Sequence, residues 1–478
     1  MSPEIIEQLL DARAMSALAP LMALAFGVVA LLLVDILPLP RALRGAVVLA
    51  TLGLAAGFQM SIFKNPPGAV LEGSLQADAT TAVWGLIFVA STLIAWLFAQ
   101  RYYVTEKALL AEHDVLMLTS CCGMMMMAGA RDLLVFFIGL ELLSIPLYAL
   151  AGFRRTNNAS VEAGLKYFIL GAFGAAIFLY GAALLYSDTG TIRLEDLRLT
   201  GAGTPLAVAG AALIAASLLF KVGVVPFHLW VPDVYQGSPT PVTALMVTGT
   251  KAAGFAFLLN ASFLLPEGAA MTLAVLAILT LAIGNLGALM QTDLKRMLAY
   301  SGIAHAGTLL FAVTGALAGD PEPGGAMQAA LFYSAAYVFT AGGAFGLIAA
   351  IEARTGRAVN LASIRGLAQR SPGAAAAMAL FMLSLGGIPA TGGFLGKYLV
   401  FSVLVRADMI AVAVLGIVLS VVALGYYLRV VVAMYMQEES ESEPAAQAPQ
   451  VPATWIAGAC AAMVVVLGVL PGWFLDRL

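Results

Sequence analysis

Long apolar runs separated by short polar connections make up almost the whole chain. A helix crosses the hydrocarbon core of a bilayer with about 20 consecutive apolar residues. Fourteen runs reach that length, so the pattern predicts an all-α polytopic membrane protein with about 14 transmembrane helices. The predicted spans are roughly 15–37, 42–63, 79–100, 112–130, 132–152, 161–187, 205–228, 240–265, 268–291, 296–317, 324–352, 374–404, 407–436 and 452–476.

Glycine and proline interrupt three of these spans, the seventh, the eighth and the twelfth. The seventh carries Gly223 and Pro226, the eighth carries Gly249, and the twelfth carries Pro389 and Gly392. Proline removes a backbone donor, and non-helical backbone at membrane depth is tolerated only inside protein or beside water. We therefore expect helices 7, 8 and 12 to be broken, which is typical of transporters built from inverted repeats.

A weak internal repeat agrees with this expectation. Spans four to eight and nine to thirteen form two sets of five helices that start on opposite sides of the membrane. Asp132 opens the fifth span as Asp293 precedes the tenth, and residues 165–176 resemble residues 331–345. We expect one transmembrane bundle, 1–478, divided into N-terminal helices 1–3 (1–110), a first five-helix repeat (111–266), an inverted second repeat (267–436), and an acidic loop with the C-terminal helix (437–478).

Composition supports the membrane assignment and narrows the function. The chain is 61% hydrophobic and 11% charged, whereas a soluble protein is about 25% charged. No basic stretch indicates nucleic acid, and the acidic start of the chain does not resemble a cleaved signal peptide. The three cysteines and three histidines lack metal or haem spacing, so we expect no cofactor in this chain and place any redox group in a partner.

Basic residues predict the orientation. Thirteen lysines and arginines fall in the odd-numbered loops, against seven in the even-numbered loops and the tails. The positive-inside rule then places the odd loops in the cytoplasm and both termini in the periplasm.

Four lysines lie inside predicted spans: Lys166, Lys221, Lys251 and Lys397. An ammonium at the centre of a bilayer costs at least ~3 kcal/mol, so such residues are retained for function. Glu141, near the middle of the fifth span, is a candidate charge partner for Lys221. Lysine suits reversible proton transfer because it can lose its proton in a buried site, which arginine does not.

Simpler roles compete with proton transfer at several of these positions. Lys166 lies only about a turn into its span and can extend its amine to the interface. His305, in the tenth span, could relay protons or be a hydrogen-bonded core residue, and we favour the relay. His228 could serve proton uptake or helix-end capping equally well. We take Glu141, Lys221, Lys251, His305 and Lys397 as the candidate proton-transfer residues, with no metal site.

Four motifs in these regions give the chain a family resemblance. They are FIGLELLSIPLYAL (137–150), FKVGVVPFHLWVPDVYQGSPTPVTALM (220–246), DLKRMLAYSGIAHAG (293–307) and GGIPATGGFLGKYLVF (386–401). Through them the chain resembles the antiporter-like membrane-arm subunits of NADH:quinone oxidoreductase (respiratory complex I), and among these the chain-2 type, subunit N. The family pattern has a Glu on helix five and Lys on helices seven, eight and twelve, which correspond here to Glu141, Lys221, Lys251 and Lys397.

The resemblance implies a subunit of a proton-translocating NADH:quinone oxidoreductase in the bacterial inner membrane. Its partners would be the other membrane-arm subunits and the lipid bilayer, in a hetero-oligomer. NADH, FMN, iron–sulfur clusters and quinone would be bound by partner subunits. We hypothesise that Glu141 and Lys221 form a switchable ion pair, whose disruption sends a proton through Lys251 and His305 to Lys397 and then outside.

Two other functions fit parts of the pattern. A cation/proton antiporter subunit of a multi-subunit complex shares the glutamate–lysine pair, and sodium-sensitive transport without NADH would identify it. A non-pumping membrane scaffold would have the same helices, but the buried amines would then lower stability without serving a function.

Overall fold

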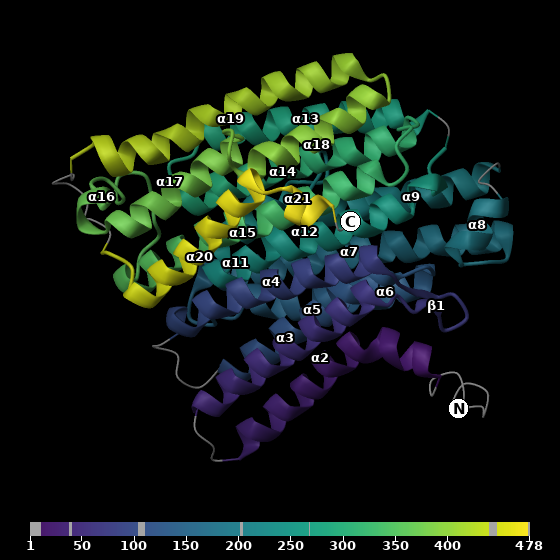
Figure 1. Cartoon of the computed structure of the whole chain (residues 1–478), viewed down its shortest axis with the longest axis horizontal. Coiled ribbons are helices and arrows are strands. Elements are labelled where there is room, and N and C mark those ends of the chain that lie inside the picture. The colour runs from purple at the N-terminus through teal and green to yellow at the C-terminus, as the bar shows by residue number, and fades with distance from the viewer. Residues whose placement is uncertain are drawn as a thin grey trace.

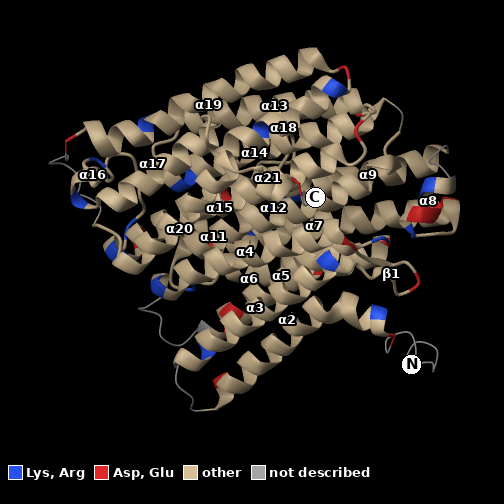
Figure 2. Ribbon diagram, viewed as in Figure 1, with Lys and Arg blue, Asp and Glu red and all other residues tan. Residues whose placement is uncertain are grey.

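The computed structural model describes residues 11–37, 41–103, 110–200, 204–266, 268–438 and 447–476. The chain's first ten residues and most of the acidic loop discussed above, residues 439–446, lie outside this part. Helices run side by side across Figure 1, with the first two spans at its lower edge and later spans at its upper edge. Charged residues gather toward the left and right ends of the bundle in Figure 2, and the middle of the helices is mostly uncharged.

Helices account for nearly all of the described chain. The helices of the spans are α2 (Ala12–Ile36), α3 (Arg41–Lys64), α4 (Ala79–Tyr102), α5 (Leu110–Gly129), α6 (Leu133–Ala151), α7 (Asn158–Thr189), α9 (Pro205–Val222), α11 (Thr240–Leu245), α12 (Lys251–Asn260), α13 (Ala269–Leu289), α14 (Leu294–Leu317), α15 (Gly325–Thr355), α17 (Pro372–Gly386), α18 (Gly392–Arg406), α19 (Ile410–Met436) and α20 (Val451–Val469). Helix α10 (Trp230–Gly237) has eight residues and lies between α9 and α11. The short elements are α8 (Leu194–Thr200), η2 (Ser262–Leu264), α16 (Leu367–Arg370), α21 (Gly472–Leu475) and an antiparallel hairpin, β1 (Gly68–Val70) with β2 (Leu75–Ala77).

The predicted spans agree with these helices. Within the described ranges, 12 helical stretches are long and apolar enough to cross a membrane, counting Thr240–Asn260 as one. The other two predicted spans are α5 and the pair α17–α18. Helices α17 and α18 have 15 residues each. The hairpin was not predicted, because its two strands of three residues are too short to give an alternating pattern.

Spans seven and twelve break in the same way. Helix α9 ends at Gly223 and α17 ends at Gly387, both in the left-handed region that glycine adopts without strain (φ 78° and 85°). The next residue in each case bonds back to the last turn, Val224 N to Leu219 O at 2.9 Å and Ile388 N to Leu383 O at 3.0 Å. The two predicted breaks are therefore confirmed.

The eighth span is interrupted in a milder form. A π-helical turn, η1 (Met246–Thr250), joins α11 to α12, and the backbone stays helical throughout. Gly249 lies in this turn because of close packing: a Cβ there would lie 2.6 Å from Met124 Sδ. Single π turns inside α-helices occur frequently at functional sites. The irregular turn lies directly before Lys251.

The two five-helix sets share a local feature at corresponding places. Asp132 and Asp293 each accept a backbone hydrogen bond as the N-cap of α6 and α14. The first residue of each helix also pairs with the segment after the next helix, Leu133 N to Ile192 O and Leu294 N to Val359 O, both at 3.0 Å. A short β-bridge therefore ties the start of α6 and of α14 in the same manner.

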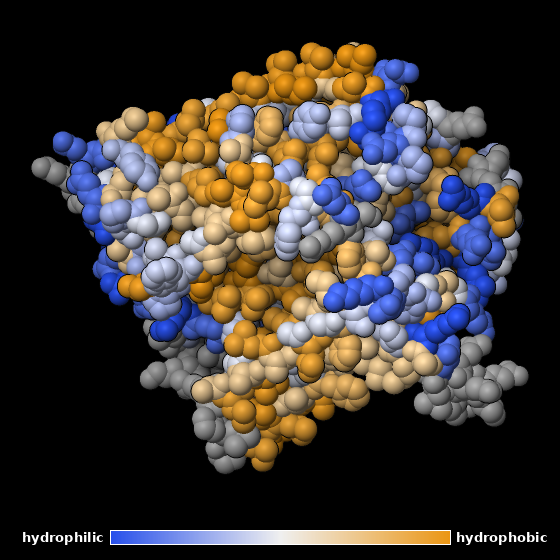
Figure 3. Space-filling view, in the orientation of Figure 1, coloured by the Kyte–Doolittle hydropathy of each residue, from blue (hydrophilic) through white to orange (hydrophobic). Residues whose placement is uncertain are grey.

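Burial separates an inner group of helices from an outer group. The stretch Thr240–Asn260 and helices α14 and α15 are almost wholly buried, whereas α2, α3, α7, α13, α19 and α20 expose apolar side chains. Figure 3 shows such surface in orange along α2 at the lower edge and α19 at the upper edge, and it suits contact with lipid. The inner helices are the ones that carry the candidate residues Lys251 and His305.

Small residues allow the helices to pack closely, as is general inside membranes. At the contact of α5 with α6, a Cβ on Gly123 would lie 2.4 Å from Leu143 N, a backbone atom that cannot move alone. Gly53 on α3, by contrast, has open space where its Cβ would be.

We expect Gly123→Ala to destabilise the folded chain by about 1–3 kcal/mol, because the added methyl forces α5 and α6 apart. The matched change Gly53→Ala should be neutral or stabilise by up to about 1 kcal/mol, since alanine favours a helix over glycine. Thermal unfolding of the purified protein in detergent measures both. Equal unfolding temperatures for the two variants would contradict the close α5–α6 contact.

Candidate functional site

The three deep lysines that the sequence singled out all lie inside the bundle. Lys221 is 6% exposed, Lys251 1% and Lys397 8%. They come from α9, α12 and α18, so each lies beside one of the irregular points of the backbone. His305 on α14 is also buried, and Glu141 on α6 is partly buried.

Lys221 is held by hydroxyl groups. Its Nζ donates to Ser144 Oγ at 2.7 Å and to Tyr167 Oη at 3.3 Å. The Nζ also lies 5.4 Å from the centre of the Tyr167 ring, within the range of a cation–π interaction. Ser144 stands one helical turn after Glu141 on α6, so the amine contacts the same helix as the carboxylate.

The structure does not join Glu141 and Lys221 by a direct ion pair. The two side chains interact electrostatically, but among the described residues no contact within 4.0 Å links them. Glu141 Oε1 is buried and has no hydrogen-bond partner. Lys221 Nζ instead donates to Ser144 Oγ, one turn further along the same helix. The predicted ion pair is thus replaced by a longer-range interaction.

Lys251 reaches across the bundle to a backbone oxygen. Its Nζ donates to Gly302 O on α14 at 2.6 Å. A Cβ on Gly223 would lie 3.9 Å from the same Nζ, so the amine also lies close to the break that follows Lys221. In the described part of the chain no carboxylate forms a salt bridge with it.

Lys397 occupies the break between α17 and α18. Its Nζ donates to Leu385 O at 2.8 Å and to Gly386 O at 3.1 Å. These carbonyls belong to the last turn of α17, where a helix carries unsatisfied oxygens and the negative end of its dipole. The break therefore creates the oxygen ligands that hold the amine.

His305 connects to two tyrosines. Its Nδ1 is hydrogen-bonded with Tyr333 Oη, and its Nε2 lies 3.1 Å from Tyr427 Oη. Tyr427 Oη is in turn hydrogen-bonded with Ser301 Oγ. A small cavity of about 10 Å³, room for about one water molecule, is lined by His305, Tyr427 and Lys397.

These contacts give an ordered series of polar groups through the inner helices. Ser301 directly precedes Gly302, whose carbonyl accepts from Lys251. His305 follows one turn later and interacts electrostatically with both Lys251 and Lys397. The tyrosine hydroxyls were not predicted, because a tyrosine in an apolar span has no sequence signal that separates a polar contact from core packing.

Lys166 lies apart from this series. Its side chain is 41% exposed and forms salt bridges with Glu162 at 2.7 Å and Asp233 at 2.9 Å. A partly exposed, salt-bridged amine agrees with the expected extension toward the interface, which stays a prediction. His228, in the segment between α9 and α10, is 9% exposed and its Nδ1 has no hydrogen-bond partner. Proton uptake and helix capping at His228 both stay predictions.

One buried charged pair escaped the sequence analysis. Lys295, which we expected in a loop, is 6% exposed in the first turn of α14 and donates to Ser238 O at 2.8 Å. Its Nζ lies 3.9 Å from Glu352 on α15, which also bonds Thr240. One sequence feature indicated this pair: Glu352 is an acidic residue at the very end of the long apolar run 324–352. The pair lines a polar cavity of about 540 Å³ that also reaches Lys166.

Comparison with known proteins gives consistent matches. The family described as "NADH:quinone oxidoreductase/Mrp antiporter, TM" matches residues 130–423. NADH-quinone oxidoreductase subunit N 2 of Roseiflexus castenholzii is 41% identical over 451 residues, 88% of each chain.

Two solved structures are similar to the chain over nearly its full length. A chain of respiratory complex I from Thermus thermophilus with bound aureothin is 37% identical, with a TM-score of 0.82 over 96% of this chain and 98% of that one. A chain of the Mrp complex from Dietzia sp. DQ12-45-1b has a TM-score of 0.86 over 98% of this chain and 96% of that one. At 21% identity, the second match shows a shared fold alone.

The absence of a carboxylate beside Lys251 predicts that this lysine does not stabilise the fold. We expect Lys251→Met to change the free energy of unfolding by no more than about 1 kcal/mol, because one hydrogen bond is lost and a buried charge is removed. Lys295→Met should cost about 3 kcal/mol, since it leaves Glu352 without its nearest cation. Thermal unfolding in detergent compares the two, and a larger loss for Lys251→Met would assign that lysine a structural role.

Proposed function

The chain belongs to the NADH:quinone oxidoreductase/Mrp antiporter membrane family, and from this premise we propose that it is the proton-translocating, antiporter-like subunit of an NADH:quinone oxidoreductase. It is a multi-pass bacterial membrane protein that works with other membrane-arm subunits in a hetero-oligomeric translocase. NADH, FMN, the iron–sulfur clusters and quinone belong in our proposal to partner subunits. The excess of basic residues in odd loops supports cytoplasmic odd loops and periplasmic termini.

One observation carries the proposal: three buried amines, which contact no carboxylate of the part of the chain that the structure describes, follow one another through the bundle. Each amine is held by neutral oxygen, from Ser144, Gly302 or the end of α17. Such oxygens accept a hydrogen bond from either the ammonium or the neutral amine, so both protonation states fit the same geometry. A lysine locked to an adjacent carboxylate would keep its proton.

In this mechanism the charge of Glu141 controls the first lysine. While Glu141 is ionised, its field favours the ammonium form of Lys221. When Glu141 takes up a proton or moves away, that support is lost and Lys221 gives its proton to a neutral Lys251. Glu141 acts here across the Ser144 turn rather than by contact, which lets its influence change without breaking a salt bridge.

The second half of the route runs from Lys251 to Lys397. His305 accepts a proton on one ring nitrogen and releases one from the other, with Tyr427 and Tyr333 as hydroxyl partners. Each hydroxyl takes up one proton as it passes its own on, so its net charge does not change. The small cavity beside His305 brings the imidazole and the Lys397 amine to a common space. From Lys397 the proton leaves toward the periplasm.

We also propose the division into inverted repeats, 111–266 and 267–436. The matching glycine breaks at Gly223 and Gly387 support it, as do the matching β-bridges at Asp132 and Asp293. Each repeat then contributes one broken helix, with a buried lysine beside the break.

Substitution of Glu141 or Lys251 by alanine tests the route. In the assembled complex we expect either change to reduce proton pumping by roughly tenfold or more, because a proton carrier or its controlling charge is removed. Assembly should be retained. Proton uptake by reconstituted vesicles, driven by NADH and quinone, provides the measurement.

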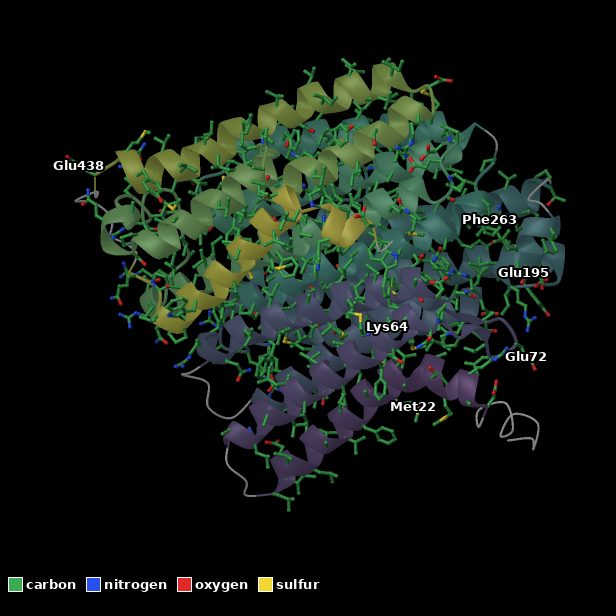
Figure 4. The ribbon with its side chains drawn as sticks, in the orientation of Figure 1. Met22, Lys64, Glu72, Glu195, Phe263 and Glu438 are labelled. Atoms are coloured by element: carbon green, nitrogen blue, oxygen red, sulfur yellow. The ribbon has the colours of Figure 1, made fainter. Side chains whose placement is uncertain are left out.

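Matched controls are Glu195→Ala and Lys64→Ala, which remove exposed charges that Figure 4 labels. Both should pump as the unmodified complex does. Full pumping by a fully assembled Glu141→Ala or Lys251→Ala complex would refute the assignment. Sodium-dependent transport without NADH would instead indicate a cation/proton antiporter.

The hydroxyl partner of His305 can be tested separately. Tyr427→Phe keeps the ring but removes the hydroxyl between His305 and Ser301, so we expect several-fold slower pumping by assembled complex. Tyr300→Phe is the control, since this tyrosine lies on α14 and its hydroxyl makes no hydrogen bond to any described residue. Equal pumping rates for the two variants would exclude Tyr427 from the route.

A further inference from the structure

A second polar cavity lies away from the lysine series, at the end of the bundle where α19 finishes. Its volume is about 550 Å³. The polar residues that line it are Thr292, Asn360, Arg365, Arg429 and Gln437. They come from the α13–α14 connection, the α15–α16 connection and α19, so three separate segments of the second half meet there.

The arginines of this cavity carry positive charge that no carboxylate of the described chain neutralises. Arg429 donates one bond, from Nη1 to Leu289 O at 2.6 Å. Arg365 has a buried Nε that no acceptor in the described ranges reaches.

The nearest acidic residues in sequence do not fill this role. Asp293 caps α14, where its carboxylate accepts from Arg296 N at 2.8 Å. Glu438 is exposed at the end of α19, and Figure 4 shows it pointing away from the bundle. A half-buried guanidinium that lacks an acceptor lowers the stability of the folded protein, so a bound anion would stabilise this site.

The walls beside the cavity are apolar. Helix α13 packs against α19, and both expose large apolar side chains on the outer surface. These include Leu286 on α13, Met290 directly after it, and Val421 and Leu428 on α19. The upper edge of Figure 3 shows the apolar surface along α19. The ligand therefore needs an anionic end for the arginines and a long apolar part for the helices.

We propose that this cavity binds the headgroup phosphate of an anionic phospholipid, whose acyl chains lie along α13 and α19. Arginine recognises phosphate with two parallel hydrogen bonds, and basic pockets between transmembrane helices bind acidic lipid headgroups. A free phosphate would satisfy the arginines but would leave the apolar walls unused. The acidic loop after α19 would also satisfy the charges, yet its apolar residues between 437 and 450 are alanines and prolines, which are too small to cover those walls. The site does not depend on the proton route.

Lipid binding to the purified complex tests the proposal. The complex is isolated through a tag on this chain, freed of lipid in mild detergent, and incubated with phosphatidylglycerol or phosphatidylcholine of the same acyl chains. Bound lipid is extracted and counted by mass spectrometry. We expect the unmodified complex to retain phosphatidylglycerol in preference, and Arg365→Gln/Arg429→Gln to retain about one molecule fewer per complex.

Two further variants separate charge from folding. Arg354→Gln/Arg357→Gln removes two exposed arginines outside the cavity and should keep the full amount of phosphatidylglycerol. Arg365→Lys/Arg429→Lys keeps the charge and should retain the lipid preference. Loss of the lipid from an assembled Lys variant or from the exposed-arginine control, or its full retention by the Gln variant, would overturn the proposal.

Competing occupants give distinct results. If millimolar inorganic phosphate displaces phosphatidylglycerol completely, the site is one for free phosphate and the proposal fails. A variant that removes four charges of the acidic loop is Glu438→Gln/Glu439→Gln/Glu441→Gln/Glu443→Gln. The proposal also fails if this variant binds phosphatidylglycerol and the unmodified complex binds none, since the acidic loop then fills the cavity. Retention that phosphate does not reverse, lost only with the two arginines of the cavity, supports the lipid.

Discussion

An amine buried among hydrocarbon requires oxygen atoms to receive its hydrogen bonds, and the backbone of this protein is arranged around that need. A carbonyl inside a regular helix already accepts from the amide four residues later, so it can take an amine only as a second donor, as Gly302 O on α14 does for Lys251. The break after α17 leaves the carbonyls of Leu385 and Gly386 for Lys397. The lysine and the break therefore satisfy each other's hydrogen-bonding groups. The break supplies acceptors for the amine, and the amine donates to carbonyls that would otherwise be unpaired at membrane depth.

The two halves of the bundle meet this requirement differently. In the first half Lys221 precedes its break and uses the hydroxyls of Ser144 and Tyr167. In the second half Lys397 follows its break and uses backbone oxygen. Lys251 lies between them, near the break at Gly223 but bonded to Gly302 on α14. The two halves therefore share the same kind of backbone break, but different oxygen atoms hold the lysine beside it.

Charge is distributed between the ends and the centre according to its partners. At the end of the bundle that holds the cavity lined by Lys295 and Glu352, basic residues are paired: Lys166 with Glu162 and Asp233, and Lys295 with Glu352. In the centre the amines lack direct carboxylate partners within the described chain, and the one nearby carboxylate, Glu141, stands a turn away. Paired charges fix structure, whereas amines held by neutral oxygen can change protonation state without losing their hydrogen-bond partner.

The sequence by itself determined the spans, the interruptions of the seventh, eighth and twelfth of them, and the placement of Lys221, Lys251 and Lys397 inside the bundle. These follow from hydrophobicity and from glycine and proline, which act locally along the chain. Only the tertiary structure decided which oxygen holds each amine, that Ser144 separates Lys221 from Glu141, and that Tyr333 and Tyr427 flank His305. Such contacts join residues far apart in sequence, 122 positions for His305 and Tyr427. They depend on how close helices pack, a property that no single apolar run records.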